Sequence, residues 1–262
     1  MTMPRFAANL SMLFTEHVSL LDRIDAAAKA GFKAIEFQFP YACKAADIRA
    51  RMNAHGLVCV LHNLPAGDWD AGERGIACHP DRVDEFRAGI DVALQYARVL
   101  GVSQLNCLAG LAPAGVPDAT LRRTLVDNLR HASDRLRTEG VNLLLEPINT
   151  FDMPGFYVSA AAQAISILDE AGADNAFVQF DVYHAQRMRG ELAGSLRQYA
   201  HRIAHVQIAD NPGRHEPGTG EINFPFLFDV LNGIGYTGWV GCEYRPMGDT
   251  VAGLGWMKPS SL

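Results

Sequence analysis

The stretch PDRVDEFRAGIDVALQYARVLGVSQLNCLA, residues 80–109, contains a helix, its end and the strand that follows. Apolar residues recur every three or four positions between Val83 and Leu100, which predicts an amphipathic helix with one buried stripe. Pro80 stands just before this helix and Gly101 directly after it, as is typical of helix ends. A short apolar run, residues 104–109, comes next, so the stretch is one unit of an alternating α/β fold.

Further apolar runs with few internal charges extend this pattern along the whole chain. The predicted strands are Arg5–Leu10, Ala34–Phe39, Val58–His62, Gln104–Ala109, Asn142–Ile148, Phe177–Asp181, Ala204–Ala209 and Trp239–Tyr244. Amphipathic segments separate them, and the predicted helices are Val18–Ala30, Ala45–His55, Arg82–Leu100, Leu121–Glu139, Ala160–Ala171 and Phe226–Ile234. Eight repeated units indicate a closed (β/α)8 barrel of the α/β class. An open doubly wound sheet is the alternative, but no G-x-G-x-x-G motif follows the first strand.

Length and composition set the class of protein. The 262 residues are 48% apolar and 20% charged, which fits one barrel domain over residues 1–262. A net charge of −6 disfavours binding to nucleic acid or an anionic membrane. Five scattered cysteines without a C-x-x-C pair indicate reduced thiols, and the N-terminus lacks the apolar run of a signal peptide. We therefore expect a cytoplasmic protein.

The last four predicted strands each carry an oxygen-bearing side chain near the carboxyl end. These residues are Glu146, Asp181, Gln207 and Glu243, roughly one βα unit apart along the chain. Because active sites of such barrels form at the carboxyl ends of the strands, we expect the four to converge. Three converging carboxylates would repel each other, and oxygen ligands favour a hard divalent cation such as Mg²⁺ or Mn²⁺. The alternative for any one of them is a structural ion pair with a nearby loop.

Several longer motifs resemble the hydroxypyruvate isomerase family, a group within the xylose isomerase-like barrels. The motifs are FAANLSMLF (6–14), HNLPAGDWDAGERGIA (62–77), EPINTFDMPGF (146–156), FDVYHAQRM (180–188), HVQIADNPGRHEPGTGEINF (205–224) and GWVGCEYRP (238–246). Together they span nearly the whole chain. The resemblance implies a single (β/α)8 TIM barrel. A similar enzyme, 2-oxotetronate isomerase, shares several of these motifs and is the alternative, together with related sugar epimerases.

The resemblance also implies the chemistry. Glu146 and Glu243 would be the catalytic acid/base pair, and Glu146, Asp181, Gln207 and Glu243 would surround the metal. Isomerisation of hydroxypyruvate to tartronate semialdehyde moves one hydrogen between adjacent carbons through an enediolate, which two carboxylates can catalyse. Related sugar epimerases have histidine where this chain has Gln207. This difference favours harder ions and leaves open whether a metal is required.

The substrate is a small oxo acid, so donors should lie near the carboxylates. The candidate substrate-binding residues are His62, His184, Arg214 and Arg245. His184 follows Asp181 by three residues, and the resemblance suggests that it hydrogen-bonds a substrate oxygen. A loop histidine without a binding role is the alternative for His184, and a satisfied pocket-edge histidine is the alternative for His62. A structural ion pair with Glu243 or Glu36 is the alternative for Arg245.

The connection over residues 63–80 is long for a strand-to-helix loop in a barrel. A loop of this kind is typical of a lid that shields a reactive intermediate from water. A rigid surface loop and an oligomer contact are the alternatives, and a homo-oligomer is possible.

Two other functions compete with an isomerase. Endonuclease IV-like phosphodiesterases resemble this barrel, but they need several histidines around a multi-zinc site, and the negative charge disfavours DNA. A non-catalytic module that binds sugar acids would also keep the barrel. The presence of both glutamates favours the enzyme.

Overall fold

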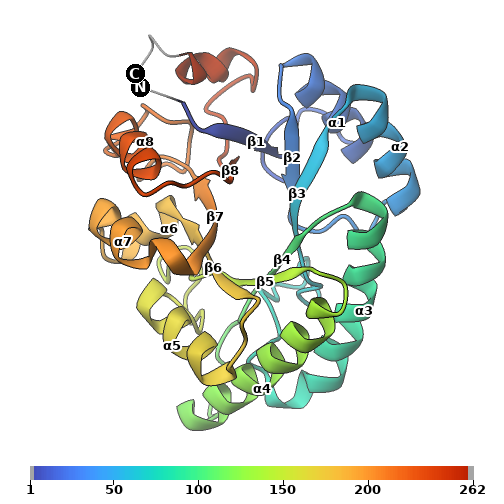
Figure 1. The fold of residues 1–262 in the computed structure, drawn as a ribbon, viewed down its shortest axis with the longest axis vertical. Coiled ribbons are helices and arrows are strands. Elements are labelled where there is room, and N and C mark those ends of the chain that lie inside the picture. Colours follow the sequence, from blue (N-terminus) through green and yellow to red (C-terminus); the bar gives the residue numbers. More distant parts are fainter. Residues whose placement is uncertain (1–2, 259–262) are drawn as a thin grey trace.

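Eight parallel strands close into a barrel in which each strand pairs with the next and β8 pairs with β1 (Figure 1). The computed structural model describes residues 3–258, so the ends of the predicted domain, residues 1–2 and 259–262, lie outside the described residues. The strands are β1 (Arg5–Asn9), β2 (Ala34–Phe37), β3 (Val58–Asn63), β4 (Gln104–Cys107), β5 (Asn142–Leu145), β6 (Ala176–Asp181), β7 (Ile203–Ile208) and β8 (Trp239–Cys242). Each predicted run overlaps one of them, which confirms the (β/α)8 barrel.

Helices surround the barrel on its outside (Figure 1). They are α1 (Leu20–Lys29), α2 (Ala45–His55), α3 (Val83–Leu100), α4 (Asp118–Arg137), α5 (Ala161–Ala171), α6 (Val182–Met188), α7 (Leu192–Tyr199) and α8 (Phe224–Gly233), with 3-10 turns η1 (Pro80–Arg82), η2 (Ala200–Arg202) and η3 (Ala252–Met257). The six predicted helices are present. Helices α6 and α7, which are short and lie between β6 and β7, were not predicted from the sequence.

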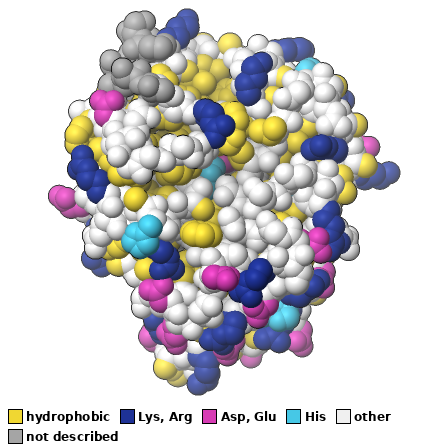
Figure 2. All heavy atoms as spheres, viewed as in Figure 1, with side chains coloured by type: hydrophobic (Ala, Val, Ile, Leu, Met, Phe, Trp, Pro, Cys, Tyr) yellow, Lys and Arg dark blue, Asp and Glu magenta, His cyan; other side chains and the backbone are white. Residues whose placement is uncertain are grey.

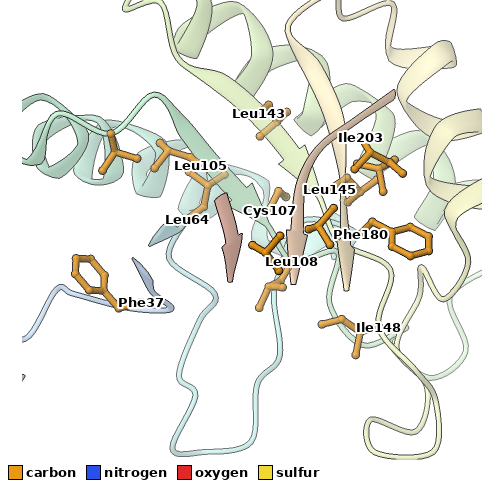
Figure 3. Close-up of a cluster of buried hydrophobic side chains, with 14 of the residues drawn as sticks. Phe37, Leu64, Leu105, Cys107, Leu108, Leu143, Leu145, Ile148, Phe180 and Ile203 are labelled. Atoms are coloured by element: carbon orange, nitrogen blue, oxygen red, sulfur yellow. The ribbon is translucent and has the colours of Figure 1, made fainter. Parts of the chain in front are cut away.

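Strand register separates the residues that face the helices from those that face the barrel axis. Leu105 pairs with Leu143, and Phe180 pairs with Val206, in the apolar layer between strands and helices. Figure 3 shows part of this layer, including Leu105, Leu143, Leu145 and Phe180. Residues one position away in each strand point to the axis, because side chains alternate along a strand. The axis therefore receives polar residues: Asn9, Glu36, Asn63, Asn106, Gln179, Asp181, His205 and Gln207.

Ion pairs on the surface join α3 to the turn after α4, and α4 to α5. Arg98 bonds Glu139 at 2.6 Å, and Arg122 bonds Glu170 at 2.7 Å. Figure 2, drawn in the same view as Figure 1, shows basic and acidic side chains interspersed over the lower half of the molecule, where α3, α4 and α5 lie. Such exposed pairs each contribute at most about 1 kcal/mol, so the apolar layer carries most of the stability.

Gly241 in β8 leaves room for a buried carboxylate across the barrel. A Cβ atom at this position would lie 2.6 Å from Cδ of Glu36, which is fully buried and held by three hydrogen bonds. We predict that Gly241→Ala lowers the free energy of unfolding by about 3 kcal/mol, measured by urea denaturation, because neither backbone nor carboxylate can move freely. Gly233→Ala is the matched control, since nothing lies within 4 Å of its Cβ position. Equal urea midpoints for the two variants would contradict this confinement of Glu36.

Candidate active site

Three carboxylates from β5, β6 and β8 meet at the carboxyl-terminal mouth of the barrel. Nη2 of Arg214 lies 2.8 Å from Oε2 of Glu243 and 3.5 Å from Oδ2 of Asp181. Nε2 of His184 lies 3.5 Å from Oδ2 of Asp181 and 4.0 Å from Oε1 of Glu146. All three carboxylates are buried. The structure therefore brings Glu146, Asp181, Glu243, His184 and Arg214 together as one cluster.

The carboxylates differ in how their charge is compensated. Burial raises the pKa of Glu146 well above its usual value, and the nearby charges of Glu243 and Asp181 raise it further. Nδ2 of Asn106 donates a hydrogen bond to Oε2 of Glu146 at 2.7 Å, which opposes this rise. Burial raises the pKa of Glu243 to about 7, although Arg214 opposes this rise. Burial also raises the pKa of Asp181. At neutral pH the site thus holds carboxylates that bind protons readily, as general acid/base catalysis requires.

Glu243 accepts more hydrogen bonds than Glu146. Nδ2 of Asn9 donates to Oε1 of Glu243 at 3.0 Å, and Nε2 of Gln38 donates to the same oxygen at 2.9 Å. Asn9, Gln38 and Asn106 were not among the residues predicted from the sequence. The strand-end rule finds Asn9 and Asn106 when it is applied to β1 and β4 as well as to the last four strands.

Arg214 is aimed inward by its loop. Its backbone adopts a left-handed conformation with φ of 56°, its N–H donates to the carbonyl of Asp210, and its carbonyl accepts from the N–H of Arg245. The Asp210 carboxylate accepts backbone N–H groups from Gly218 and Gly220 and so holds the rest of the loop. The side chain of Arg245 is exposed, and within the described residues only its backbone forms hydrogen bonds. The structure does not bring Arg245 to the carboxylates.

Gln207 lies beside Asp181, its register partner, but its amide belongs to a buried network. Oε1 of Gln207 accepts from Nε2 of Gln179 at 2.7 Å, and its Nε2 donates to Oε1 of Glu36 at 2.7 Å. Glu36 also bonds Nε2 of His205 at 2.7 Å and Nδ2 of Asn9 at 3.0 Å. Because Asn9 donates to both Glu36 and Glu243, it connects this buried network to the carboxylate cluster at the mouth of the barrel.

His62 is buried on the other face of its strand. It pairs with Phe37 and Leu105 in the outer layer and stacks on the Phe37 ring at 6.4 Å, whereas Asn63 takes the position at the axis. Its Nδ1 lies 3.1 Å from the carbonyl of Asn63, and burial lowers its pKa to about 4. The structure therefore does not bring His62 to the carboxylates, and no ionised histidine is expected there.

The predicted lid, residues 63–80, is anchored at its second half. Backbone N–H of Cys78 donates to Ala109 at 2.8 Å, and Gly75 packs so closely that an added Cβ would lie 2.8 Å from Cβ of Leu108. Glu73 is bonded to Arg82 at 2.5 Å. The exposed residues at the tip are Asp68, Asp70, Ala71 and Gly72, so lid motion is expected there, whereas Trp69 between them is half-buried against Phe39.

Ligand atoms from Glu146, Asp181 and His184 lie within 4.8 Å of one another, which is the spacing of a possible cation site. Asp181 and Glu243 share Nη2 of Arg214, which places an oxygen of Glu243 beside this set. Oε1 of Gln207 instead accepts a hydrogen bond from Gln179 in the buried network. Oxygen donors dominate this set, and oxygen donors suit Mg²⁺ or Mn²⁺.

Comparison with known proteins agrees with this fold. The family model for the xylose isomerase-like TIM barrel matches residues 24–260, and the chain belongs to this family. It is 51% identical to hydroxypyruvate isomerase of Escherichia coli over 98% of this chain and 99% of that protein. It is 50% identical to 2-oxo-tetronate isomerase of Cupriavidus necator over 98% of both chains. The chain is thus an enzyme of this family and of the isomerase type.

Solved structures show the same fold. A Brucella melitensis protein named AP endonuclease, family 2 matches with a TM-score of 0.95 and 44% identity over 99% of this chain and 100% of that one. The 3-keto-D-glucoside 4-epimerase of Escherichia coli matches over 98% and 99% of the two chains with a TM-score of 0.81 and 20% identity. Within residues 3–258, none of the helices has the length and apolar character needed to cross a membrane.

The raised pKa of Glu243 has a consequence for stability. Between its usual pKa near 4.5 and its folded value of about 7, the unfolded chain loses the proton while the folded chain keeps it, so the folded state loses stability as pH rises. We predict that Glu243→Gln, in chelator, gains stability relative to wild type by up to about 3 kcal/mol between pH 4.5 and 8. Buried histidines with a lowered pKa, such as His62, make stability rise with pH. Both proteins contain them, so this contribution cancels in the difference between the two stabilities. A stability difference that is independent of pH would contradict the buried, proton-binding Glu243.

Proposed function

We propose that the chain interconverts hydroxypyruvate and tartronate semialdehyde through an enediolate. The observation that carries the proposal is the pair of buried glutamates at the ends of β5 and β8, in one cluster with Asp181, Arg214 and His184. Two carboxylates on different walls of a barrel mouth can reach adjacent carbons of a small substrate. The 51% identity to a hydroxypyruvate isomerase supports the same reaction.

The reaction balances as two proton transfers at carbon. One glutamate removes a proton from the hydroxymethyl carbon C3, and the electron pair forms the enediolate with the C2 carbonyl. The other glutamate delivers a proton to C2, while the hydroxyl proton passes from O3 to O2, leaving an aldehyde at C3. Glu243 accepts three side-chain hydrogen bonds and Glu146 accepts one, which favours Glu243 as the ionised base and Glu146 as the acid. His184 and Arg214 donate toward developing negative charge.

A divalent cation, Mg²⁺ or Mn²⁺, fits the donor set. Arg214 pairs with two of the three buried carboxylates, Asp181 and Glu243, so the cluster has excess negative charge when all three are ionised. The oxygens of Glu146, Asp181, Gln207 and Glu243 would hold the ion. When bound, it would stabilise negative charge on the substrate oxygens.

The alternative substrate is the four-carbon acid 2-oxotetronate, because a 2-oxo-tetronate isomerase is 50% identical to this chain. Kinetics on hydroxypyruvate and 2-oxotetronate, followed side by side by NMR with Mg²⁺ or with chelator, decide between them. We expect the higher kcat/KM for hydroxypyruvate and a loss of rate in chelator. A higher kcat/KM for 2-oxotetronate would assign the four-carbon substrate.

A nuclease is the second candidate, because the similar Brucella melitensis protein bears the name of an AP endonuclease. Among the described residues, His184 is the histidine that contacts the site carboxylates Glu146 and Asp181. The net charge of the chain is −6. Both features favour proton transfer on a small acid over phosphodiester hydrolysis. Tight binding or cleavage of DNA at physiological salt would reverse this ranking.

A further inference from the structure

His184 uses its two ring nitrogens differently. Its Nδ1 lies 2.6 Å from Nδ2 of Asn149 and 3.4 Å from the backbone nitrogen of the same residue. Its Nε2 faces the carboxylates of Asp181 and Glu146. The ring is buried, so its protons are set by these neighbours and not by solvent.

The orientation of the Asn149 amide is fixed by its own hydrogen bonds. Oδ1 accepts the backbone N–H groups of Phe151, at 3.1 Å, and of Asp152, at 2.8 Å. Nδ2 donates to Oδ2 of Asp152 at 3.1 Å, and the same oxygen also accepts from the Tyr183 hydroxyl at 2.7 Å. A flipped amide would turn its NH2 group toward two N–H donors and its oxygen toward a carboxylate. Nδ2 is therefore the atom that faces His184, and it is a donor.

Both neighbours of His184 Nδ1 are hydrogen-bond donors, so Nδ1 must be the acceptor. The ring proton then resides on Nε2, between Asp181 and Glu146. A doubly protonated ring would direct an Nδ1–H at two donors, so the same contacts favour the neutral ring. A histidine that binds a cation through Nε2 needs its lone pair there and usually donates Nδ1–H to an acceptor. That acceptor is absent among the described neighbours of His184.

We propose that Asn149 is a positioning residue that keeps the ring proton of His184 on Nε2. His184 then donates a hydrogen bond from Nε2 and stays outside the coordination of any cation held by Glu146 and Asp181. Its acceptor is a substrate oxygen on which negative charge develops, and this last part rests on the proposed function. A neutral imidazole that donates in this way is an effective electrophile.

The first test reads the tautomer directly. The chain is labelled with ¹⁵N-histidine, and the His184→Gln spectrum identifies the signals of His184 among those of the nine histidines. We expect Nδ1 to be unprotonated and Nε2 to carry the proton, with and without Mg²⁺. A proton on Nδ1, or loss of the Nε2 proton when Mg²⁺ is added, would overturn the proposal. This readout needs no turnover, so it stands whether or not hydroxypyruvate is the substrate.

The second test reverses the tautomer by exchanging two side chains. In Asn149→Asp with Asp152→Asn, residue 149 offers an acceptor to Nδ1, and residue 152 supplies the amide that the new carboxylate needs. The control is Asp152→Asn alone, which keeps Asn149. Relative to this control, we expect the proton to move to Nδ1 and kcat to fall by about 10²-fold with KM within about threefold. A moved proton with unchanged kcat would refute the role of the Nε2 donor, and an unmoved proton would refute positioning by Asn149.

Discussion

Replacing Glu243 with glutamine is expected to lower kcat for hydroxypyruvate isomerisation by about 10³-fold or more, with the barrel intact. Glutamine has nearly the same shape but cannot take up or release a proton at neutral pH. It can still accept a hydrogen bond from Asn9, Gln38 or Arg214, so the wall of the site should keep its form. The rate is measured by NMR of substrate and product, and the fold by circular dichroism.

The control for Glu243→Gln is Glu139→Gln. Glu139 is a surface carboxylate bonded to Arg98 at 2.6 Å, and its loss should change kcat by less than about twofold. Glu243→Gln with activity near that of wild type would remove Glu243 from the acid/base pair.

Replacing Arg214 with methionine is expected to lower kcat/KM by about 10²-fold or more, because two buried carboxylates lose their shared cation. The charges of Glu243, Asp181 and Glu146 raise the pKa of Arg214 although burial opposes this, so Arg214 stays positive at neutral pH. Methionine keeps much of the apolar stem but offers neither charge nor hydrogen-bond donors. Steady-state kinetics and urea denaturation of the variant separate the effect on the substrate from the effect on the fold.

Arg245→Met is the matched variant, and it also decides the predicted substrate-binding role of Arg245. Since this side chain is exposed and forms no hydrogen bond or ion pair within residues 3–258, we expect kcat/KM within about threefold of wild type. A KM effect as large as that of Arg214→Met would assign Arg245 to substrate binding and would contradict the distinction between the two arginines.

Most of the barrel was predictable because strand runs and helix stripes repeat along the chain. The sixth unit is the exception. Helices α6 and α7 have seven and eight residues, so neither displays the several turns of periodicity that a pattern needs. Short helices of this kind depend on tertiary packing more than on their own sequence. Asp181 begins α6 as its N-cap, accepting the N–H of Tyr183, while its other oxygen faces Arg214.

The site was predictable where one rule sufficed. Glu146, Asp181 and Glu243 follow from their position at strand ends. Glu36 could not be found in this way, because its role depends on register across the barrel, where it meets Gln207, His205 and the space left by Gly241. His62 was expected at the mouth, but alternation along β3 turns it to the outer layer. Strand-end position alone does not tell which face a side chain takes.

Transfer of hydrogen from solvent to carbon tests the central claim most directly. The wild-type chain is incubated with hydroxypyruvate in heavy water, and deuterium at C3 of the substrate and at C2 of tartronate semialdehyde is followed by NMR. Proton removal by a carboxylate in the barrel mouth predicts deuterium at these carbons, with incorporation lost in Glu243→Gln. Turnover without deuterium incorporation, or incorporation that persists in Glu243→Gln at the wild-type rate, would contradict it.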